Sequence, residues 1–293
     1  ENASARKGIF MIDAAKGFIK DGPKNRLRDQ DVHKIVDAFA RMADVPRYAR
    51  MVSFDEISDP KNDFNLNLPR YIDSTEPEDI QDIVGHLRGG IPERDIDAFD
   101  SYWQVMPALR TALFKPASHP GYFERVSPEG KSVIFAHPQF TGFKAGVDTL
   151  FKQWLANSTP QLKGFAADEA SSHPKALIAT LSEDVLNAFA KAPLLDYYDI
   201  YQHLMDYWAE TMQDDCYLIA DAGWVAGAQP RDMVKLTDAT GKLVWPKEAF
   251  DYEKGKRRFK SDLIPAALLI ARYFTVERDA IAALEAELAS IEQ

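Results

Sequence analysis

The chain has 293 residues, of which 46% are hydrophobic and 27% charged, and this composition is typical of a globular protein. Its longest apolar run lies within residues 262–272 and is far shorter than the roughly 18 residues that a membrane span needs. The single cysteine, Cys216, excludes an internal disulfide and a cysteine-rich zinc site. We therefore expect a soluble protein with no membrane partner, in a reducing compartment such as the cytoplasm.

The net charge of −10 is unevenly distributed along the chain. Residues 1–80 carry −2, residues 81–240 carry −8 and residues 241–293 are neutral. Lys and Arg bind the phosphates of a DNA duplex by displacing counterions, so the acidic middle is a poor surface for DNA. Any contact with DNA is expected to come from the two ends of the chain.

Residues 1–78 are predicted to form the end of a catalytic α/β sheet followed by a linker. The continuous apolar run of residues 7–13 is typical of a strand buried on both faces. Such a strand needs a neighbour on each side, and only a few polar residues precede it here. We therefore expect its partners to come from later residues or from another part of a longer protein, which makes this chain a fragment.

The rest of this first segment contains a helix and a second strand. Asp29 and Asp31 are possible N-caps of an amphipathic helix. The apolar residues that follow them at helical spacing are Val32, Ile35, Val36, Phe39 and Met42. Residues 48–54 are predicted to form a strand, and a boundary is expected near 75–80. The intervening loop contains Asn65, Asn67 and Arg70, which we expect to hold backbone groups rather than to read bases.

Residues 79–215 are predicted to form a helical domain, because their apolar residues recur mostly with a period of 3.6. Helices are expected from Pro92 to Met106, over 143–155, over 177–189 and over 197–212. The pattern then changes to short β-like pieces in residues 216–262. Residues 216–220 are predicted to form a strand, and residues 232–237 and 242–245 a hairpin around 238–241.

Two basic clusters flank turns and are candidates for contact with DNA phosphates. They comprise Lys24, Arg26 and Arg28 near the start, and Lys254, Lys256, Arg257, Arg258 and Lys260 near the end. Aromatic residues beside the second cluster, such as Trp245 and Phe259, could stack on unpaired bases. A pairing of either cluster with the acidic middle of the chain, or with a partner subunit, is an equally open alternative.

Residues 263–293 are predicted to begin a long C-terminal helix without interruption. Its apolar residues follow a spacing of seven, three, four and three, which is the start of a coiled-coil seam. The seam comprises Phe274, Ile281, Leu284, Leu288 and Ile291. About two heptads are too few for a stable seam, so we expect either that a longer helix has been cut or that this face docks onto a partner or onto the body of the chain. The whole chain is thus expected to be mixed α/β and mainly helical.

Several catalytic motifs are absent from the sequence. No two of the fifteen glycines are spaced G-x-G, and no G-x-x-x-x-G-K-[ST] phosphate loop occurs. The six histidines never lie three or four residues apart, so no helical metal site is predicted. Cys216 is expected to be a buried core residue, and His119 and His137, each before a proline, to lie at turns rather than act as bases.

Several ordered stretches resemble the methylation (M) subunit of bacterial type I restriction-modification systems. They are residues 24–36, 48–52, 63–71 and 89–92, with weaker likeness through 86–103, 212–217 and 261–266. The resemblance implies that residues 9–13 form a late strand of that family's catalytic sheet. It also implies a parent enzyme that methylates the N6 atom of DNA adenine with S-adenosylmethionine.

The family's cofactor pocket and its Asn-Pro-Pro-aromatic motif lie upstream of this region, and no Pro-Pro pair occurs here. We therefore assign no catalytic or cofactor-binding residue, and we expect the isolated chain to be inactive and not to bind S-adenosylmethionine. The resemblance implies assembly with a specificity subunit, a second modification subunit and a restriction subunit on double-stranded DNA. The rival hypothesis is an independent helical adaptor that binds a protein through the seam and has no role on DNA.

Overall fold

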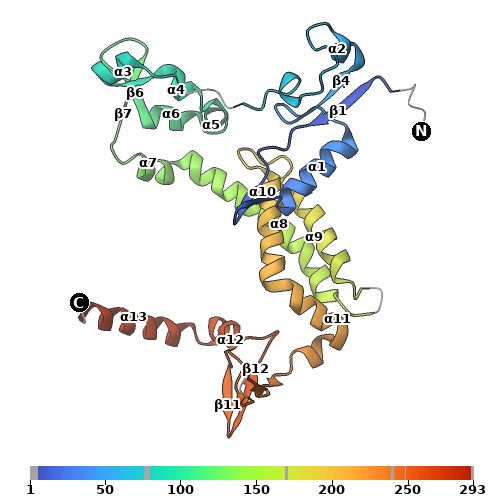
Figure 1. Cartoon of the computed structure of the whole chain (residues 1–293). Helices are drawn as coiled ribbons and strands as arrows, with labels where there is room; N and C mark the ends of the chain where they lie inside the picture. Colours follow the sequence, from blue (N-terminus) through green and yellow to red (C-terminus); the bar gives the residue numbers. More distant parts are fainter. Residues whose placement is uncertain (1–5, 76–79, 169–170, 239–240, 248, 292–293) are drawn as a thin grey trace. The chain divides into compact units, whose positions relative to one another are not determined.

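The computed structural model describes residues 6–75, 80–168, 171–238, 241–247 and 249–291 (Figure 1). The chain divides into two compact units. Unit 1 comprises Glu1–Thr159 and Thr180–Asp206, and unit 2 comprises Pro160–Ala179 and Tyr207–Gln293. The protein is mixed α/β and mainly helical, as the sequence predicts. No described helix has the length and apolar character needed to cross a membrane.

Unit 1 begins with a two-stranded antiparallel layer. Strand β1 (Gly8–Ile12) pairs with β4 (Ala49–Ser53), and Ile9 lies opposite Val52. Helix α2 (Phe54–Ser58) follows β4 directly, because the Ser53 hydroxyl accepts a hydrogen bond from the Glu56 amide and caps it. A 3-10 turn, η2 (Leu68–Arg70), brings the chain back to the layer.

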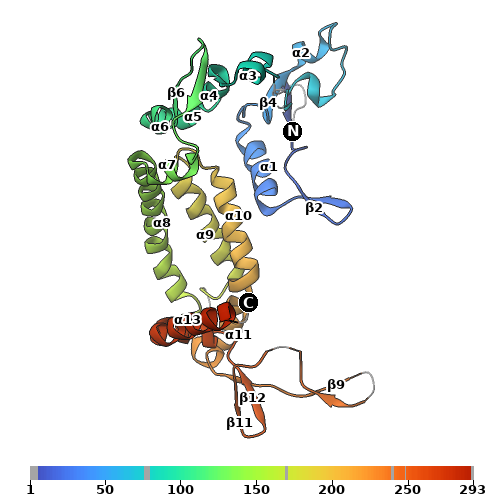
Figure 2. The same ribbon diagram turned by 90° about the vertical axis from the view of Figure 1, so that its left-hand side faces the viewer.

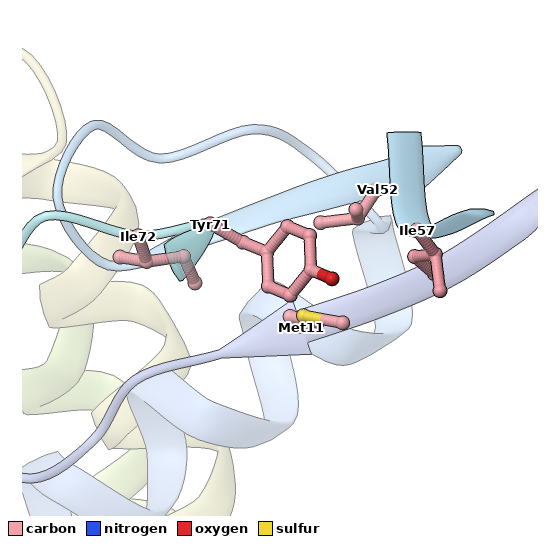
Figure 3. Packing of buried hydrophobic residues seen from close by; sticks show 5 residues of the cluster. All are labelled: Met11, Val52, Ile57, Tyr71 and Ile72. Carbon is pink, nitrogen blue, oxygen red and sulfur yellow. The ribbon is translucent and has the colours of Figure 1, made fainter. Parts of the chain in front are cut away.

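One face of this layer carries a small apolar core (Figure 3). Val52 is 0% exposed, and Tyr71 lies close to it with its ring toward the strands. The members of this core are Met11, Val52, Ile57, Tyr71 and Ile72. On the other face, Ala49 of β4 is 1% exposed, and Phe10 and Ile12 of β1 are half-buried. Strand β1 is therefore mostly half-buried, and the prediction that it is buried on both faces is wrong. Among the described residues its pairing strand is β4, which comes later in the chain.

The loop before η2 holds its own backbone, as expected. The Asn65 side chain accepts from the Asn67 amide at 2.9 Å, and Arg70 donates to the Lys61 carbonyl at 3.1 Å. The Tyr71 hydroxyl donates to the Asn65 carbonyl at 2.6 Å. These polar side chains are committed to the loop, which leaves their base-reading role without support.

Helix α1 (Asp29–Arg41) forms where the sequence predicts it, but its orientation is unexpected. Its buried residues are Gln30, Asp31 and Ala38, whereas the apolar Val36 and Phe39 are 58% and 60% exposed. The polar side of the helix packs on a neighbouring helix through hydrogen bonds, which the apolar periodicity alone does not reveal.

The next part of unit 1 alternates short helices and strands. They are α3 (Ile83–Arg88), β5 (Ile91–Pro92), α4 (Glu93–Asp97), α5 (Asp100–Val105), α6 (Pro107–Leu113), β6 (Phe114–Pro116), β7 (Tyr122–Arg125) and α7 (Gly130–Ala136). The strands form a sheet in the order β5-β7-β6. The sequence predicted a helical domain here and did not predict this sheet. The strands have two to four residues, too few to show a period of two.

The helix expected from Pro92 to Met106 is also divided. Phe99, with φ −91° and ψ 25°, lies between α4 and α5 and interrupts the helical hydrogen bonds. The Trp103 indole donates to the Ile96 carbonyl at 2.7 Å across this break. Ile96 and Met106 are buried, whereas Phe99 and Tyr102 are 55% and 47% exposed, so the predicted apolar face is not continuous.

Three longer helices follow at the predicted places. They are α8 (Pro138–Gly164), α9 (Pro174–Phe189) and α10 (Tyr197–Tyr207). Their unit 1 parts run side by side (Figures 1 and 2), and the Trp154 indole donates to the Leu181 carbonyl at 3.3 Å. Leu186 packs with Tyr198 and Tyr201 in a second buried cluster.

Unit 2 contains a π-helical turn, η3 (Trp208–Met212), followed by α11 (Gln213–Gly227). The strand predicted over residues 216–220 is therefore wrong, because these residues lie inside α11. A short apolar run fits a buried helix as well as a buried strand. Cys216 and Ile219 are both buried at helical spacing, and the Trp224 indole donates to the Phe165 carbonyl at 2.7 Å. Gly223 breaks the helix with φ 77°, a conformation that favours glycine.

The rest of unit 2 consists of small sheets and two helices. The predicted hairpin forms between β9 (Leu236–Thr237) and β10 (Leu243–Val244). A second sheet has the order β11-β12-β8, with β8 (Arg231–Asp232), β11 (Tyr252–Lys254) and β12 (Arg257–Lys260). Helices α12 (Ala266–Tyr273) and α13 (Thr275–Ile291) end the described chain.

Candidate nucleic-acid interface

The first basic cluster lies on a hairpin in unit 1. Strands β2 (Ile19–Asp21) and β3 (Lys24–Arg26) pair across a two-residue turn whose Gly22 has φ 58°. Lys24 and Arg26 are exposed, and Arg26 makes a 3.3 Å ion pair with Asp21. Two of the three predicted cations are therefore accessible to a phosphate.

Arg28 has a structural role at the start of α1 instead. Its guanidinium makes two 2.9 Å hydrogen bonds with Asp31, and the Asp31 carboxylate accepts a third from the Arg28 amide. The Asp31 side chain is 7% exposed. Burial by itself would raise the pKa of Asp31, but the hydrogen bonds from Arg28 outweigh it, and the net pKa is lowered.

This capping pair is expected to stabilise the protein in a pH-dependent way. A carboxylate whose pKa is lower in the folded state contributes stability above its unfolded pKa and loses it as the pH falls through the folded pKa. Asp31→Asn should therefore cost about 1–2 kcal/mol at pH 7 and much less near pH 2. Urea unfolding at both pH values measures the difference, and a penalty that is equal at both would contradict this role.

The second basic cluster lies on the hairpin of β11 and β12 in unit 2. Lys254 lies opposite Arg257, so the turn consists of Gly255 and Lys256, and Gly255 has φ 68°. Lys254 and Lys256 are exposed, whereas Lys260 is half-buried.

The two arginines of the cluster bind groups of the same sheet region. Arg257 donates to the Asp232 carboxylate of β8 at 2.5 and 2.8 Å. Arg258 pairs with Glu253 at 3.3 Å and lies over the rings of Trp245 and Phe250, at 4.8 and 4.4 Å from their centres. The five predicted cations therefore do not form one uniform basic patch.

The predicted partner seam is only partly continuous. Phe274 lies between α12 and α13 with φ −131° and ψ 36°, so the expectation of an uninterrupted helix is wrong at this residue. Within α13, Ile281, Leu284 and Leu288 share one side and are 57%, 64% and 56% exposed. The side chain of Ile291 lies outside the described residues. The seam thus reduces to three exposed apolar residues on α13.

Cys216, His119 and His137 make contacts within the fold. Burial raises the pKa of the Cys216 thiol to about 11, with a further contribution from Asp215, so the thiol is unreactive at neutral pH. The His137 ring accepts from the Gln139 amide at 3.2 Å at the start of α8. The His119 ring lies 4.3 Å from that of Tyr122. The part of the chain that the structure describes contains no group of three or more metal-ligand side chains.

A polar interface within unit 1 was not predicted from the sequence. His33 of α1 contacts the Glu183 carboxylate at 2.9 Å, and its ring lies edge-on to Tyr201. The Tyr198 hydroxyl donates to Asp37 at 2.9 Å, and burial raises its pKa. Gln30 also binds helix α10, where its side chain donates to Asp199 at 2.8 Å. The spacing of Gln30, His33 and Asp37 at three and four residues is the signal that could have revealed this face.

A cleft of about 460 Å³ lies beside this interface, next to the end of β1. The Asp13 carboxylate at its wall accepts from the Ser74 hydroxyl at 2.7 Å and from the Ala15 amide at 3.0 Å. Lys34 lies 4.0 Å from Asp196 and over the Tyr48 ring at 4.8 Å. Acidic and basic groups of the cleft therefore largely neutralise one another.

Comparison with known proteins places the similarity in the first part of the chain. Residues 1–80 match the model of the N-6 DNA methylase family. Methylase subunits MjaVIII and MjaVII of type I restriction enzymes from Methanocaldococcus jannaschii are each 35% identical to this chain, over 82 and 86 residues. The MpnII methylase subunit of Mycoplasma pneumoniae is 28% identical over 83 residues.

These alignments cover 27–28% of this chain and 14–15% of each relative. The chain therefore aligns with a small part of the curated relatives that it matches. No solved structure matches it significantly. The weaker likeness noted in residues 86–103, 212–217 and 261–266 stays a prediction.

The N-6 methylase family uses S-adenosylmethionine, and the cleft beside β1 is the cavity of the methylase region to compare with it. Close approach of a backbone to a nucleotide cofactor ordinarily needs a glycine-rich turn after a strand. Here Gly17 is the glycine of that segment, and a Cβ on it would lie 2.9 Å from the Asp31 carboxylate. The space beside Gly17 is thus occupied by Asp31, and we assign no cleft residue to the cofactor.

The strand pair β1–β4, helix α1 and the loop to Tyr71 all lie in the matched segment, and they are the elements that the sequence resemblance singles out. Residues 1–80 are an N-6 DNA methylase region, and through it the chain is distantly similar to the methylase subunits of type I restriction enzymes.

Proposed function

We propose that this chain is part of the modification subunit of a type I restriction-modification system, acting in the cytoplasm. In that role the assembled enzyme methylates the N6 atom of adenine in double-stranded DNA with S-adenosylmethionine. The observation that carries the proposal is the match of residues 1–80 to the N-6 DNA methylase family. The chain would contribute assembly and DNA contacts, because no catalytic or cofactor-binding residue is assigned to it.

Two surfaces of the methylase region support this role. Among the described residues, β4 is the strand that pairs with β1, so the other edge of β1 presents backbone groups that another strand could bind. The apolar side of α1 is also exposed, with Val36 at 58% and Phe39 at 60%. An unpaired strand edge and exposed apolar surface each suit packing against the rest of a catalytic domain.

The exposed residues of α13 support assembly with other subunits. Ile281, Leu284 and Leu288 recur at three and four residues and suit an apolar helix-to-helix contact. We assign this contact to the specificity subunit. A second modification subunit and the restriction subunit complete the proposed complex.

Methyl transfer by the assembled complex tests the proposal. The full-length modification subunit that contains this chain is purified with the specificity subunit encoded beside it. It is then incubated with plasmid DNA and methyl-labelled S-adenosylmethionine. We expect labelled N6-methyladenine in the digested DNA, and none when the specificity subunit is omitted.

The same experiment tests the adaptor hypothesis. A protein that forms no complex with the specificity subunit, and whose mixture with it transfers no methyl group, would contradict the modification-subunit role. A complex that forms through α13 but neither methylates nor binds DNA would favour the adaptor.

A further inference from the structure

The cations of the β11–β12 hairpin fall into two classes. Arg257 and Arg258 are paired with Asp232 and Glu253, and Arg258 also lies over two aromatic rings. Turning either guanidinium toward a phosphate would break these contacts and leave a carboxylate without its cation. The arginines therefore stabilise the hairpin.

Lys254 and Lys256 are placed differently. They flank Gly255 at the tip of the hairpin, and both are exposed. Neither has an ion pair with another residue in the ranges that the structure describes. A lysine ammonium is a compact charge on a flexible stem, so it can reach a phosphate without a fixed geometry. The tip is therefore the free cationic part of this hairpin.

The two faces of the hairpin differ as well. On one face the rings of Tyr252 and Phe259 stack 5.0 Å apart at 11°, and Tyr252 is 45% exposed. Lys254 shares this face, because it is two residues from Tyr252 on the same strand. On the other face, Arg258 lies between the rings of Trp245 and Phe250. Ring contacts therefore stabilise both faces of the short hairpin that ends in this tip.

We propose that this hairpin contacts the phosphate backbone of duplex DNA through Lys254 and Lys256, while Arg257 and Arg258 brace it and touch no DNA. This inference rests on the proposed function, which supplies duplex DNA as the bound molecule. A narrow tip with two adjacent cations suits a phosphate strand better than it suits a broad protein interface. Phosphate contacts position a protein and carry no sequence information.

The salt dependence of DNA binding tests this division. Each phosphate that is neutralised contributes a slope of about −0.9 to log K against log salt. The double variant Lys254→Gln with Lys256→Gln, in the assembled complex, should reduce the slope by about 1.8 in magnitude. Between 50 and 200 mM salt the wild-type complex should then lose about tenfold more affinity than the variant. Cognate and random duplexes should be affected alike.

Two matched variants control for other causes. Lys242→Gln with Lys247→Gln removes the same charge from exposed positions in unit 2 and should leave the slope near that of the wild type. Arg257→Gln with Arg258→Gln should lower the melting temperature but keep the slope when measured below it.

Three results would overturn the proposal. The first is an unchanged slope in the two-lysine variant. The second is the loss of subunit assembly in that variant, which would assign the tip to an acidic protein surface. The third is a fall in slope in the two-arginine variant as large as that in the lysine variant. A wild-type complex that neither binds nor methylates DNA would instead count against the proposed function itself.

Discussion

Replacing Val52 with aspartate is expected to unfold the β1–β4 layer of the methylase region. Val52 is 0% exposed and packs with Met11, Ile57 and Tyr71. Arg50 lies on the same face of β4 but is already paired with Glu56 at 2.6 Å, so the new carboxylate would be buried without a free cation, at a cost above about 4 kcal/mol. That is a large share of the roughly 5–15 kcal/mol that stabilises an ordinary domain.

Hydrogen exchange measured by mass spectrometry on the full chain can localise this effect. Peptides covering residues 7–13 and 48–58 should lose protection, while peptides from α9 and α10 retain most of theirs. Met51→Asp is the matched control, because Met51 is next on the same strand, faces the other side and is 41% exposed. We expect the control to cost less than about 1 kcal/mol. Equal loss of protection in both variants would contradict the assignment of the core to the Val52 face.

The second large effect is expected at α13. Replacing Ile281, Leu284 and Leu288 together with aspartate should abolish association with the specificity subunit, since three charges would enter an apolar helix contact. Each buried apolar side chain contributes roughly 1.5–3 kcal/mol, so even two such losses weaken binding more than a hundredfold. Binding of the purified subunits, measured by calorimetry, gives the change in affinity.

The helix offers a control with the same spacing. Ala283, Ala286 and Ser290 are exposed on the opposite side of α13 and also lie three and four residues apart. Replacing these three with aspartate adds the same charge and should change affinity little. If the two triple variants bind equally well, the seam is not the contact. If both lose affinity and helicity by circular dichroism, the charge has unfolded the helix instead.

Much of the local structure could be predicted because it depends on short-range preferences. Helix α9 forms over Pro174–Phe189, where apolar periodicity places it, and the β9–β10 hairpin forms around the predicted turn. The Asn65 loop holds its backbone as its polar composition suggests. These features need only neighbouring residues, whose periodicity and turn chemistry are visible in the chain. The resemblance in residues 1–80 was likewise present in ordered local motifs.

The tertiary structure decided which of these features are paired and which are free. The apolar residues of α1 predicted an amphipathic helix, yet its polar side is the buried one, because the hydrogen bonds that His33 and Asp37 make with α9 and α10 compensate the loss of water. Among the basic residues, Arg28, Arg257 and Arg258 are held by carboxylates of their own units, whereas Lys254 and Lys256 are not. Amino-acid composition does not distinguish a paired cation from an unpaired one. Only the folded chain brings Asp232 beside Arg257, 25 residues away, and so decides which charges remain for a partner.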